Sequence, residues 1–332
     1  MKNILIFLLF SIIFFKEAKS APAIINGKSL NISEVPYQVA LVDINSKIHF
    51  CGGAFLKLDF VITAAHCIGL DENGKEKKDF IISGGSNTYS DRLATELKVL
   101  DVFVHPQYNK DIVDFDFALV KFKNILNFPT IQHLVHLPPL IETQLPEGFL
   151  MLFSGWGKTL SIFEPRKFLR GVTIPIYNQQ KCIDVYDFEN VDITDRMICA
   201  GYKKGTSGLC FGDSGGPLVS YENKYLYGLA SFVPSAECGT SKLPTVFARV
   251  SAARDWIVKI AGDDNKIIPN QIQAIHENQT ETTTSKKIIT EPELLTYPVS
   301  VTKFPQIETL YGDMKTQSIP SKKIQSNLFS VV

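Results

Sequence analysis

The chain has 332 residues, of which 45% are hydrophobic and 20% are charged, and its 34 basic residues balance its 34 acidic ones. This composition is that of a globular protein, and the balanced charge argues against nucleic acid as a partner. Single domains usually have about 100 to 200 residues and all-β domains extend to about 250, so we expect one large domain with an appended segment.

The N-terminal segment predicts a secretory signal peptide over residues 1–20. Lys2 precedes an apolar run over residues 4–15, and the small residues Ala18 and Ser20 lie before the expected cut. The run is too short to span a bilayer, which needs about 20 apolar residues. The order of these segments disfavours the alternative of a buried N-terminal helix. We therefore expect a secreted, extracellular protein without a membrane anchor.

Export permits disulfides and glycans. Asn31-Ile32-Ser33 and Asn278-Gln279-Thr280 are candidate N-glycosylation sequons, although such short triplets often arise by chance. The even number of cysteines fits a disulfide framework, but spacing alone leaves the pairing open. The cysteines are Cys51, Cys67, Cys182, Cys199, Cys210 and Cys238.

The segment between Ile24 and Val250 predicts many short strands. Apolar residues form short alternating or continuous runs, separated by Gly, Asn, Asp and Pro, and no strand–helix alternation is present. Examples of these runs are residues 37–42, 60–63, 97–104 and 225–232. The pattern is typical of an all-β sandwich or barrel.

A helix is expected at the end of this domain, followed by a different kind of segment. Apolar residues recur at helical spacing over residues 251–262, where Ser251 can cap the start and Gly262 can close the end. Residues 263–332 contain no Cys or Trp and are rich in Thr, Ser, Lys and Glu. We expect a largely disordered extension. The alternative is that it holds short elements that dock on the main domain, and it is also a candidate localisation or partner-binding arm.

Three segments carry residues suited to nucleophilic catalysis. Ser214 lies among glycines in residues 210–217, where the absence of side chains lets a substrate carbonyl approach backbone N–H groups. A glycine-rich turn is the alternative for this segment alone. His66 ends a strand-like run, and Asp116 lies inside an apolar run, where a carboxylate is costly without a partner. Together they supply a nucleophile, a base and a group that orients the base.

The order His66, Asp116, Ser214, with these flanks, resembles the chymotrypsin family of serine proteases. Residues 24–27 with 36–39 look like the mature N-terminus of that family, and residues 154–157 match a further signature. The resemblance covers residues 24–262. It implies two antiparallel six-stranded barrels, a catalytic triad between them and a C-terminal helix.

The resemblance also assigns roles. His66 would take the proton of Ser214, Asp116 would orient His66, and Ser231 would support Asp116. The backbone N–H groups of Gly212 and Ser214 would form the oxyanion hole. The implied disulfides are Cys51–Cys67, Cys182–Cys199 and Cys210–Cys238, and Met151 and Ser220 occupy both positions of a further family bridge, which is therefore absent.

Activation in the resembling family requires release of an N-terminal isoleucine. Here Ile24 would be freed, and its ammonium would pair with buried Asp213. A signal cut after Ser20 leaves residues 21–23 as a short propeptide, although Ala21 and Ala23 would also allow later cuts. Because Ala23 replaces the Arg or Lys of most relatives, an activator of trypsin-like specificity is not expected.

The expected specificity pocket lacks an acidic residue. Gly208 matches the position at which trypsin-like relatives carry an aspartate, and Leu209 follows it. Val233 and Thr245 match the pocket walls, where branched side chains resemble those of the pancreatic elastases, and Ser231 and Phe232 complete the substrate-binding set. We expect cleavage after small or apolar residues.

Three other interpretations remain. Gly212-x-Ser214-x-Gly216 also fits the nucleophile elbow of α/β-hydrolases, but that fold places its histidine after the serine, and only His276 follows here. His133 and His136 are potential metal ligands without an apparent third ligand. A catalytically silent homologue that acts as a binding or regulatory module is the alternative to an enzyme. We expect a monomer that needs no metal or cofactor, acts on proteins or peptides and binds protein protease inhibitors.

Overall fold

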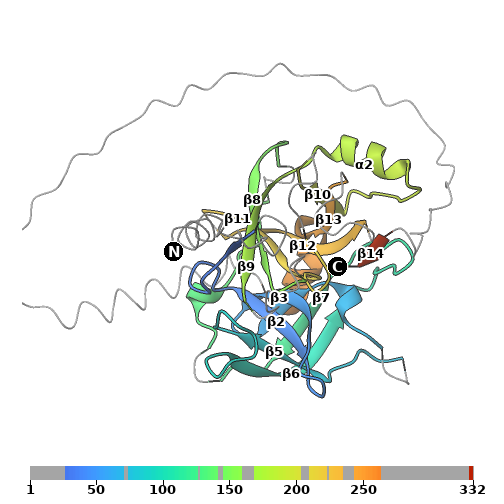
Figure 1. Ribbon diagram of the computed structural model, residues 1–332. Coiled ribbons are helices and arrows are strands. Elements are labelled where there is room, and N and C mark those ends of the chain that lie inside the picture. Colours follow the sequence, from blue (N-terminus) through green and yellow to red (C-terminus); the bar gives the residue numbers. More distant parts are fainter. Residues whose placement is uncertain are drawn as a thin grey trace, which may run out of the picture. The chain divides into compact units, whose positions relative to one another are not determined.

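The computed structural model describes residues 27–70, 74–125, 128–140, 145–158, 168–202, 209–222, 224–234, 243–262 and 329–331. Its first part is a closed barrel of antiparallel strands in the order β2-β3-β4-β7-β6-β5 (Figure 1). The strands are β2 (Gln38–Asp43), β3 (His49–Lys57), β4 (Phe60–Thr63), β5 (Phe80–Gly84), β6 (Thr95–Val104) and β7 (Ala118–Phe122), with short helices η1 (Ala65–Cys67) and η2 (Ile131–His133). This barrel confirms the first of the two expected.

The second part is a single sheet whose path runs β1-β9-β8-β11-β12-β13-β10, with β14 beside β12. Its strands are β1 (Lys28–Ser29), β8 (Leu150–Gly155), β9 (Arg170–Pro175), β10 (Met197–Ala200), β11 (Pro217–Ser220), β12 (Leu226–Pro234), β13 (Thr245–Arg249) and β14 (Phe329–Val331).

The expected second barrel is therefore found as a sheet that a strand ladder does not close within the described residues. One isolated antiparallel bridge, between Ile176 and Ala200, links the end of β9 to β10. Two backbone hydrogen bonds flank it, from Tyr177 to Cys199 at 2.8 Å and from Gly201 to Pro175 at 2.9 Å. The pairing between the end of β9 and β10 spans only these few residues, because the chain enters helix α2 two residues after Tyr177.

Three helical segments belong to the second part: α2 (Gln179–Asp187), η3 (Val250–Ala253) and α3 (Arg254–Ala261). The expected C-terminal helix is confirmed, and Gly262 ends it with a positive φ of 85°. Ser251 does not cap it, because η3 comes first and Ala253 is the N-cap residue of α3. Helix α2 was not expected from the sequence; the Asn178 side chain caps it by accepting the Lys181 N–H at 3.0 Å.

Alternate residues of the barrel strands face two different cores. On β2, Val39 and Leu41 pack inside the first barrel, whereas Ala40 and Val42 join a second cluster. That cluster also contains side chains of the second sheet, such as Leu229 of β12. Because successive strand residues point to opposite faces, a run that is buried on both faces lacks the usual apolar–polar alternation. This shared core joins the two parts of the domain.

The disulfide predictions are confirmed where both partners are described. Cys51 is bonded to Cys67, and Cys182 to Cys199. Cys210 is also disulfide-bonded, and Cys238 lies outside the described residues. Met151 and Ser220, which occupy the positions of the missing family bridge, lie directly opposite each other on β8 and β11.

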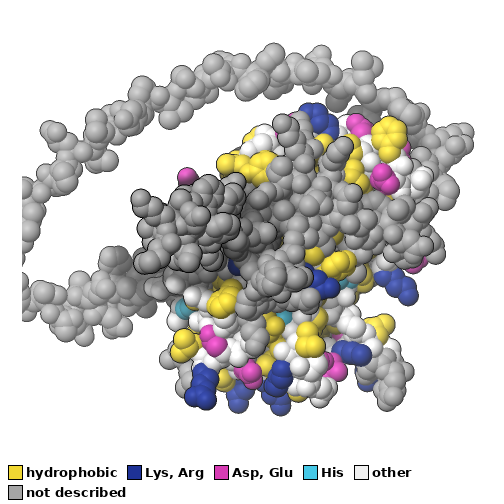
Figure 2. Space-filling view, in the orientation of Figure 1, with side chains coloured by type: hydrophobic (Ala, Val, Ile, Leu, Met, Phe, Trp, Pro, Cys, Tyr) yellow, Lys and Arg dark blue, Asp and Glu magenta, His cyan; other side chains and the backbone are white. Residues whose placement is uncertain are grey.

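Within the described residues, no helix is long and apolar enough to cross a membrane. Basic and acidic side chains are interspersed on the visible face of the first barrel (Figure 2), as the balanced composition predicts. The predicted signal peptide, propeptide and most of the C-terminal extension lie outside the described residues. Residues 329–331 of that extension form β14, so the alternative of a short docking element holds at this point.

Candidate active site

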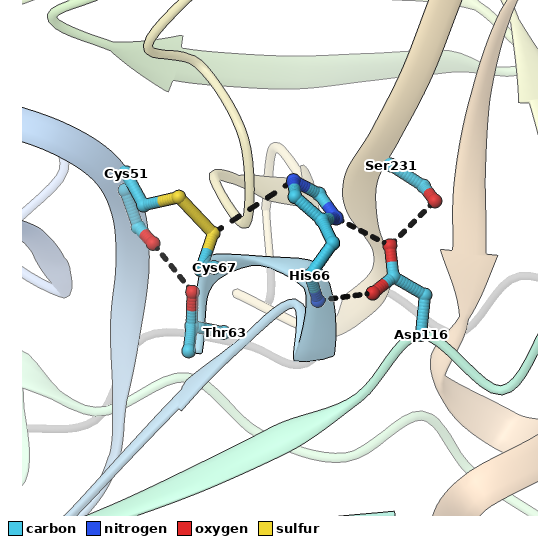
Figure 3. Close-up of a disulfide and its surroundings, with 7 residues drawn as sticks. Cys51, Thr63, His66, Cys67, Asp116 and Ser231 are labelled. Carbon is cyan, nitrogen blue, oxygen red and sulfur yellow. Dashed lines mark hydrogen bonds and ion pairs between the residues drawn. A yellow bond between two sulfur atoms is a disulfide. The ribbon is translucent and has the colours of Figure 1, made fainter. Parts of the chain in front are cut away.

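His66 and Asp116 are brought together by the pairing of β4 with β7. Thr63 at the end of β4 lies opposite Ala118 at the start of β7, so η1 and the residues before β7 meet at one end of the barrel. The His66 backbone N–H donates to Asp116 Oδ1 at 2.9 Å, and His66 Nδ1 lies 2.7 Å from Asp116 Oδ2 (Figure 3). Both carboxylate oxygens therefore hold the histidine, one through its backbone and one through its ring.

Ser231 of β12 supports the same carboxylate from the second sheet. Its hydroxyl donates to Asp116 Oδ2 at 2.6 Å (Figure 3). The pairing of β12 with β13 shifts register between Ala230 and Phe232, at Ser231 itself. Asp116 has no exposed surface, and a buried carboxylate is tolerated when it is well hydrogen-bonded. The expected support of Asp116 by Ser231 is thus present as a contact.

Ser214 lies on a loop that is fixed to both parts of the domain. Its carbonyl accepts the Gly52 N–H at 2.7 Å, and the next residue, Gly215, donates to Ala230 at 2.8 Å. Gly215 has a φ of 70°, and a β-carbon at this position would collide with the Thr63 hydroxyl. Glycine is therefore required here by both conformation and space. The loop is packed against the end of β4, two residues before η1 begins.

The hydroxyl of Ser214 makes no hydrogen bond to His66 within the described part of the chain. His66 Nε2 instead lies 3.8 Å from Cys67 Sγ (Figure 3). The hydrogen bond between a nucleophile and its base is commonly long in an enzyme without substrate and shortens in the reacting complex. The structure therefore brings the two segments together without forming the Ser214–His66 hydrogen bond.

The expected oxyanion donors precede β11. Gly212 has a φ of 95°, a conformation that favours glycine. Among the hydrogen bonds of the described residues, none has the backbone N–H of Gly212 or Ser214 as its donor.

Asp213 is fully buried between the Ser214 loop and the end of β8. It accepts backbone N–H groups from Gly157 at 3.0 Å and from Cys210 at 2.9 Å. Burial raises the pKa of this carboxyl to about 7, although both hydrogen bonds act in the opposite direction. Among the described residues no cation forms an ion pair with Asp213. Ile24, its expected partner, lies outside them.

The residues expected to form the specificity pocket lie on β12 and β13 and in the segment before Ser214. Leu209, Val233 and Thr245 are all buried, and Leu209 and Val233 belong to one apolar cluster. Phe232 instead packs against Tyr186 of α2 in a different cluster. Gly208 lies outside the described residues.

Two features of the site were not found from the sequence. The Asp114 carboxylate accepts Arg196 Nη2 at 2.6 Å and the Thr194 hydroxyl at 2.9 Å, just before Asp116. The His49 ring packs beside Tyr89, and its Nε2 is buried without a hydrogen-bond partner among the described residues. Asp114 itself is visible in the sequence as an acidic residue near Asp116, but its partner Arg196 is remote in sequence. Nothing in the sequence marked the buried ring of His49.

The possible metal ligands do not form a plausible metal site. Cys51, His66 and Cys67 have ligand atoms within 4.8 Å of one another. The disulfide between the two cysteines leaves no thiolate to bind an ion. His133 interacts with Thr130 at 2.7 Å and His136 packs near Tyr225, and neither joins a group of ligands within the described residues.

Comparisons with known proteins identify the family. Residues 24–257 match the family described as Trypsin. The chain is 34% identical over 249 residues to Trypsin 5G1 of Aedes aegypti, covering 75% of this chain and 89% of that protein. It is 30% identical over 249 residues to Ovochymase of Halocynthia roretzi, covering 73% of this chain and 15% of that protein. It is 31% identical over 261 residues to Transmembrane protease serine 9 of Rattus norvegicus, covering 77% of this chain and 24% of that protein. The chain thus spans a minor part of the last two relatives. Taken with the barrel, the disulfides and the contacts around Asp116, the match over residues 24–257 shows that this chain belongs to the trypsin family.

Proposed function

We propose that this chain is a secreted serine endopeptidase that cleaves proteins or peptides through an acyl-enzyme. The single observation that carries the proposal is the hydrogen-bonded series from Ser231 to Asp116 to His66, beside a loop that holds Ser214. The names of two relatives, Trypsin 5G1 and Transmembrane protease serine 9, support the same reaction class. The presence of His66, Asp116 and Ser214 together disfavours a catalytically silent homologue.

In the proposed reaction, Ser214 Oγ attacks the scissile carbonyl while His66 Nε2 takes its proton. Asp116 keeps Nδ1 protonated, so that Nε2 is the free base, and stabilises the imidazolium that forms. The N–H groups of Gly212 and Ser214 donate to the developing oxyanion, and each such donor contributes on the order of 10² to 10³ in rate. His66 then gives the proton to the leaving amine, and water releases the acyl group by the same steps.

Activation is proposed to depend on Ile24 and Asp213. The raised pKa of Asp213 reflects a buried carboxyl without a cation among the described residues, and the freed ammonium of Ile24 supplies one. Asp213 is adjacent to Ser214 in sequence. Pairing it would therefore fix the segment that carries both the nucleophile and the oxyanion donors.

The preferred substrate residue before the cut is proposed to be small and aliphatic, as in an elastase. Val233 and Thr245 are buried, branched side chains at the matched wall positions, and Gly208 supplies no carboxylate at the base. A single methylene in such a pocket changes binding by about 1 to 3 kcal/mol, so the preference is graded.

Exposed Asn31 is a proposed glycan site, whereas Asn278 lies outside the described residues. Protein protease inhibitors remain proposed partners, and the protein a proposed monomer.

Peptide profiling tests the reaction and its specificity together. The chain is prepared with Ile24 as its N-terminus and given peptides that differ only in the residue before the cut. We expect the highest kcat/KM for Ala or Val, and a Val233→Gly, Thr245→Gly double variant is expected to gain activity toward Phe. Val233→Thr, which keeps a branched side chain, is the matched control. A clear preference of the unaltered enzyme for Arg or Lys contradicts the specificity, and no cleavage of any peptide contradicts the proposed reaction.

A further inference from the structure

A segment from the far end of the chain pairs with the strand that supports Asp116. Strand β14 is antiparallel to β12, with Val331 opposite Phe232, Ser330 opposite Val233 and Phe329 opposite Pro234. A strand added to a sheet edge gains backbone hydrogen bonds whatever its side chains. This pairing therefore occupies backbone groups of Phe232 and Val233, two residues of the expected substrate-binding set.

The two sides of β12 show which edge β14 covers. Phe232 is paired with Val246 of β13 as well as with Val331, so β13 and β14 lie on opposite edges. On the edge of β12 away from β13, the earlier residues pair with β11. Ala230 comes next, and its N–H donates to the Gly216 carbonyl of the Ser214 loop at 2.9 Å. The part of β12 that pairs with β14 starts at Phe232, two residues beyond Ala230, where Val331, the last residue of β14, lies opposite it. Strand β14 thus continues along the edge at the point where the nucleophile loop leaves it.

The direction of β14 is that of the acyl part of a substrate. Because it is antiparallel to β12, it runs from Pro234 toward Phe232, and hence toward Ser231 and the loop of Ser214. A peptide bound in this way presents the carbonyl at its C-terminal side to the nucleophile. Any peptide substrate that is recognised through its backbone on this edge must displace β14.

We propose that residues 329–331 are an intramolecular inhibitor that competes with peptide substrates for the free edge of β12. The inference rests on the proposed protease function. An attached segment competes at an effective concentration on the order of 1 mM, so weak pairing suffices to occupy the edge. If the edge is free for only a fraction of the time, the apparent affinity for substrate falls by that fraction. The inhibition acts on KM, because substrate that has bound reacts as usual.

The test compares the chain beginning at Ile24 with the same chain lacking residues 329–332. Both are titrated with an organophosphate to count reactive serines, and peptide hydrolysis is measured per reactive site. We expect equal titration, a KM at least about 3-fold lower in the shortened chain for peptides of four or more residues before the cut, and the same kcat. Ser330→Ala, which leaves the backbone pairing intact, is the matched control and should behave as the full chain.

A synthetic peptide with the sequence of residues 325–332 gives an independent readout on the shortened chain. We expect competitive inhibition by this peptide and none by a scrambled peptide of the same composition. Equal KM values for the full and shortened chains, with equal serine titration, overturn self-inhibition and leave the protease intact. No reactive serine in either chain overturns the proposed function, and the inhibitory role with it.

Discussion

The Nδ1 atom of His66 lies 2.7 Å from Asp116 Oδ2, and that oxygen also receives the Ser231 hydroxyl. We predict that Asp116→Asn lowers kcat by about 10⁴-fold and leaves KM nearly unchanged, because an amide no longer fixes the histidine tautomer. Steady-state kinetics of the variant with a good peptide substrate measures both quantities. A kcat within tenfold of the unaltered enzyme would show that Asp116 does not orient the base.

Ser231→Ala separates support of the carboxylate from its direct action. The variant leaves His66 and Asp116 in place but removes one donor from a fully buried carboxylate. We expect the free energy of unfolding to fall by about 1 to 3 kcal/mol and kcat to fall much less than in Asp116→Asn. Urea denaturation gives the first value. Unchanged stability would mean that the hydrogen bond is replaced by water.

The ion pair of Asp114 and Arg196 ties the segment before Asp116 to the segment before β10. Phe115, between the two aspartates, has a φ of 49°, an unfavourable conformation for a bulky residue, and the Arg196 guanidinium lies over its ring at 5.4 Å. Because the Arg196 side chain is 35% exposed, we predict a coupling of only about 1 kcal/mol in a double-mutant cycle of Asp114→Asn and Arg196→Met. Strictly additive losses of unfolding free energy would rule the coupling out.

The pKa of Asp213, raised to about 7, predicts a pH-dependent difference between the precursor and the processed chain. A carboxyl whose folded pKa is raised binds more protons in the folded state, so its stabilising effect is present below about pH 4 and is lost as the pH rises through 7. The precursor should lose about 4 kcal/mol of unfolding free energy across this range relative to the chain beginning at Ile24. Parallel pH profiles of the two forms would contradict the Ile24–Asp213 pair.

His49 predicts an effect of acid on stability. Burial lowers its pKa from 6.5 to about 4, against the effect of a hydrogen bond with the Cys51 backbone. A depressed pKa means that the unfolded chain binds more protons, so stability is present above about pH 6.5 and is lost as the pH falls through 4. We expect about 3 kcal/mol of this loss to be absent in His49→Gln. Denaturation at a series of pH values compares the slopes, and equal slopes would mean that the ring protonates freely in the folded state.

The sequence predicted those features that depend on short segments. The run Phe60–Thr63 is found as β4 with the predicted bounds, and the helix that ends at Gly262 is present, because apolar pattern and glycine conformation act locally. Helix α2 was missed because its start depends on one capping side chain, Asn178, rather than on an apolar stripe. The pairing of β14 with β12 depends on an edge that forms only when the second sheet has assembled, which no local pattern encodes.

Site contacts divide in the same way. The catalytic roles of His66, Asp116 and Ser214 were predicted from their flanks and stay predictions, whereas the contact of Ser231 with Asp116, expected from the family resemblance, is present. Arg196 was missed because it lies 82 residues from Asp114, directly before β10 of the second sheet. Nothing in the sequence around a single arginine indicates which carboxylate it will pair with. The direct approach of Ser214 to His66 remains a prediction.

Covalent labelling of Ser214 is the most direct measurement of the central claim. The chain beginning at Ile24 is treated with an organophosphate serine probe and the labelled peptide is identified by mass spectrometry, with His66→Ala and Ser214→Ala as controls. We predict stoichiometric labelling of Ser214 in the unaltered chain, labelling slower by several orders of magnitude in His66→Ala and none in Ser214→Ala. An unaltered chain that is folded and correctly processed but takes up no label at Ser214 would contradict the claim.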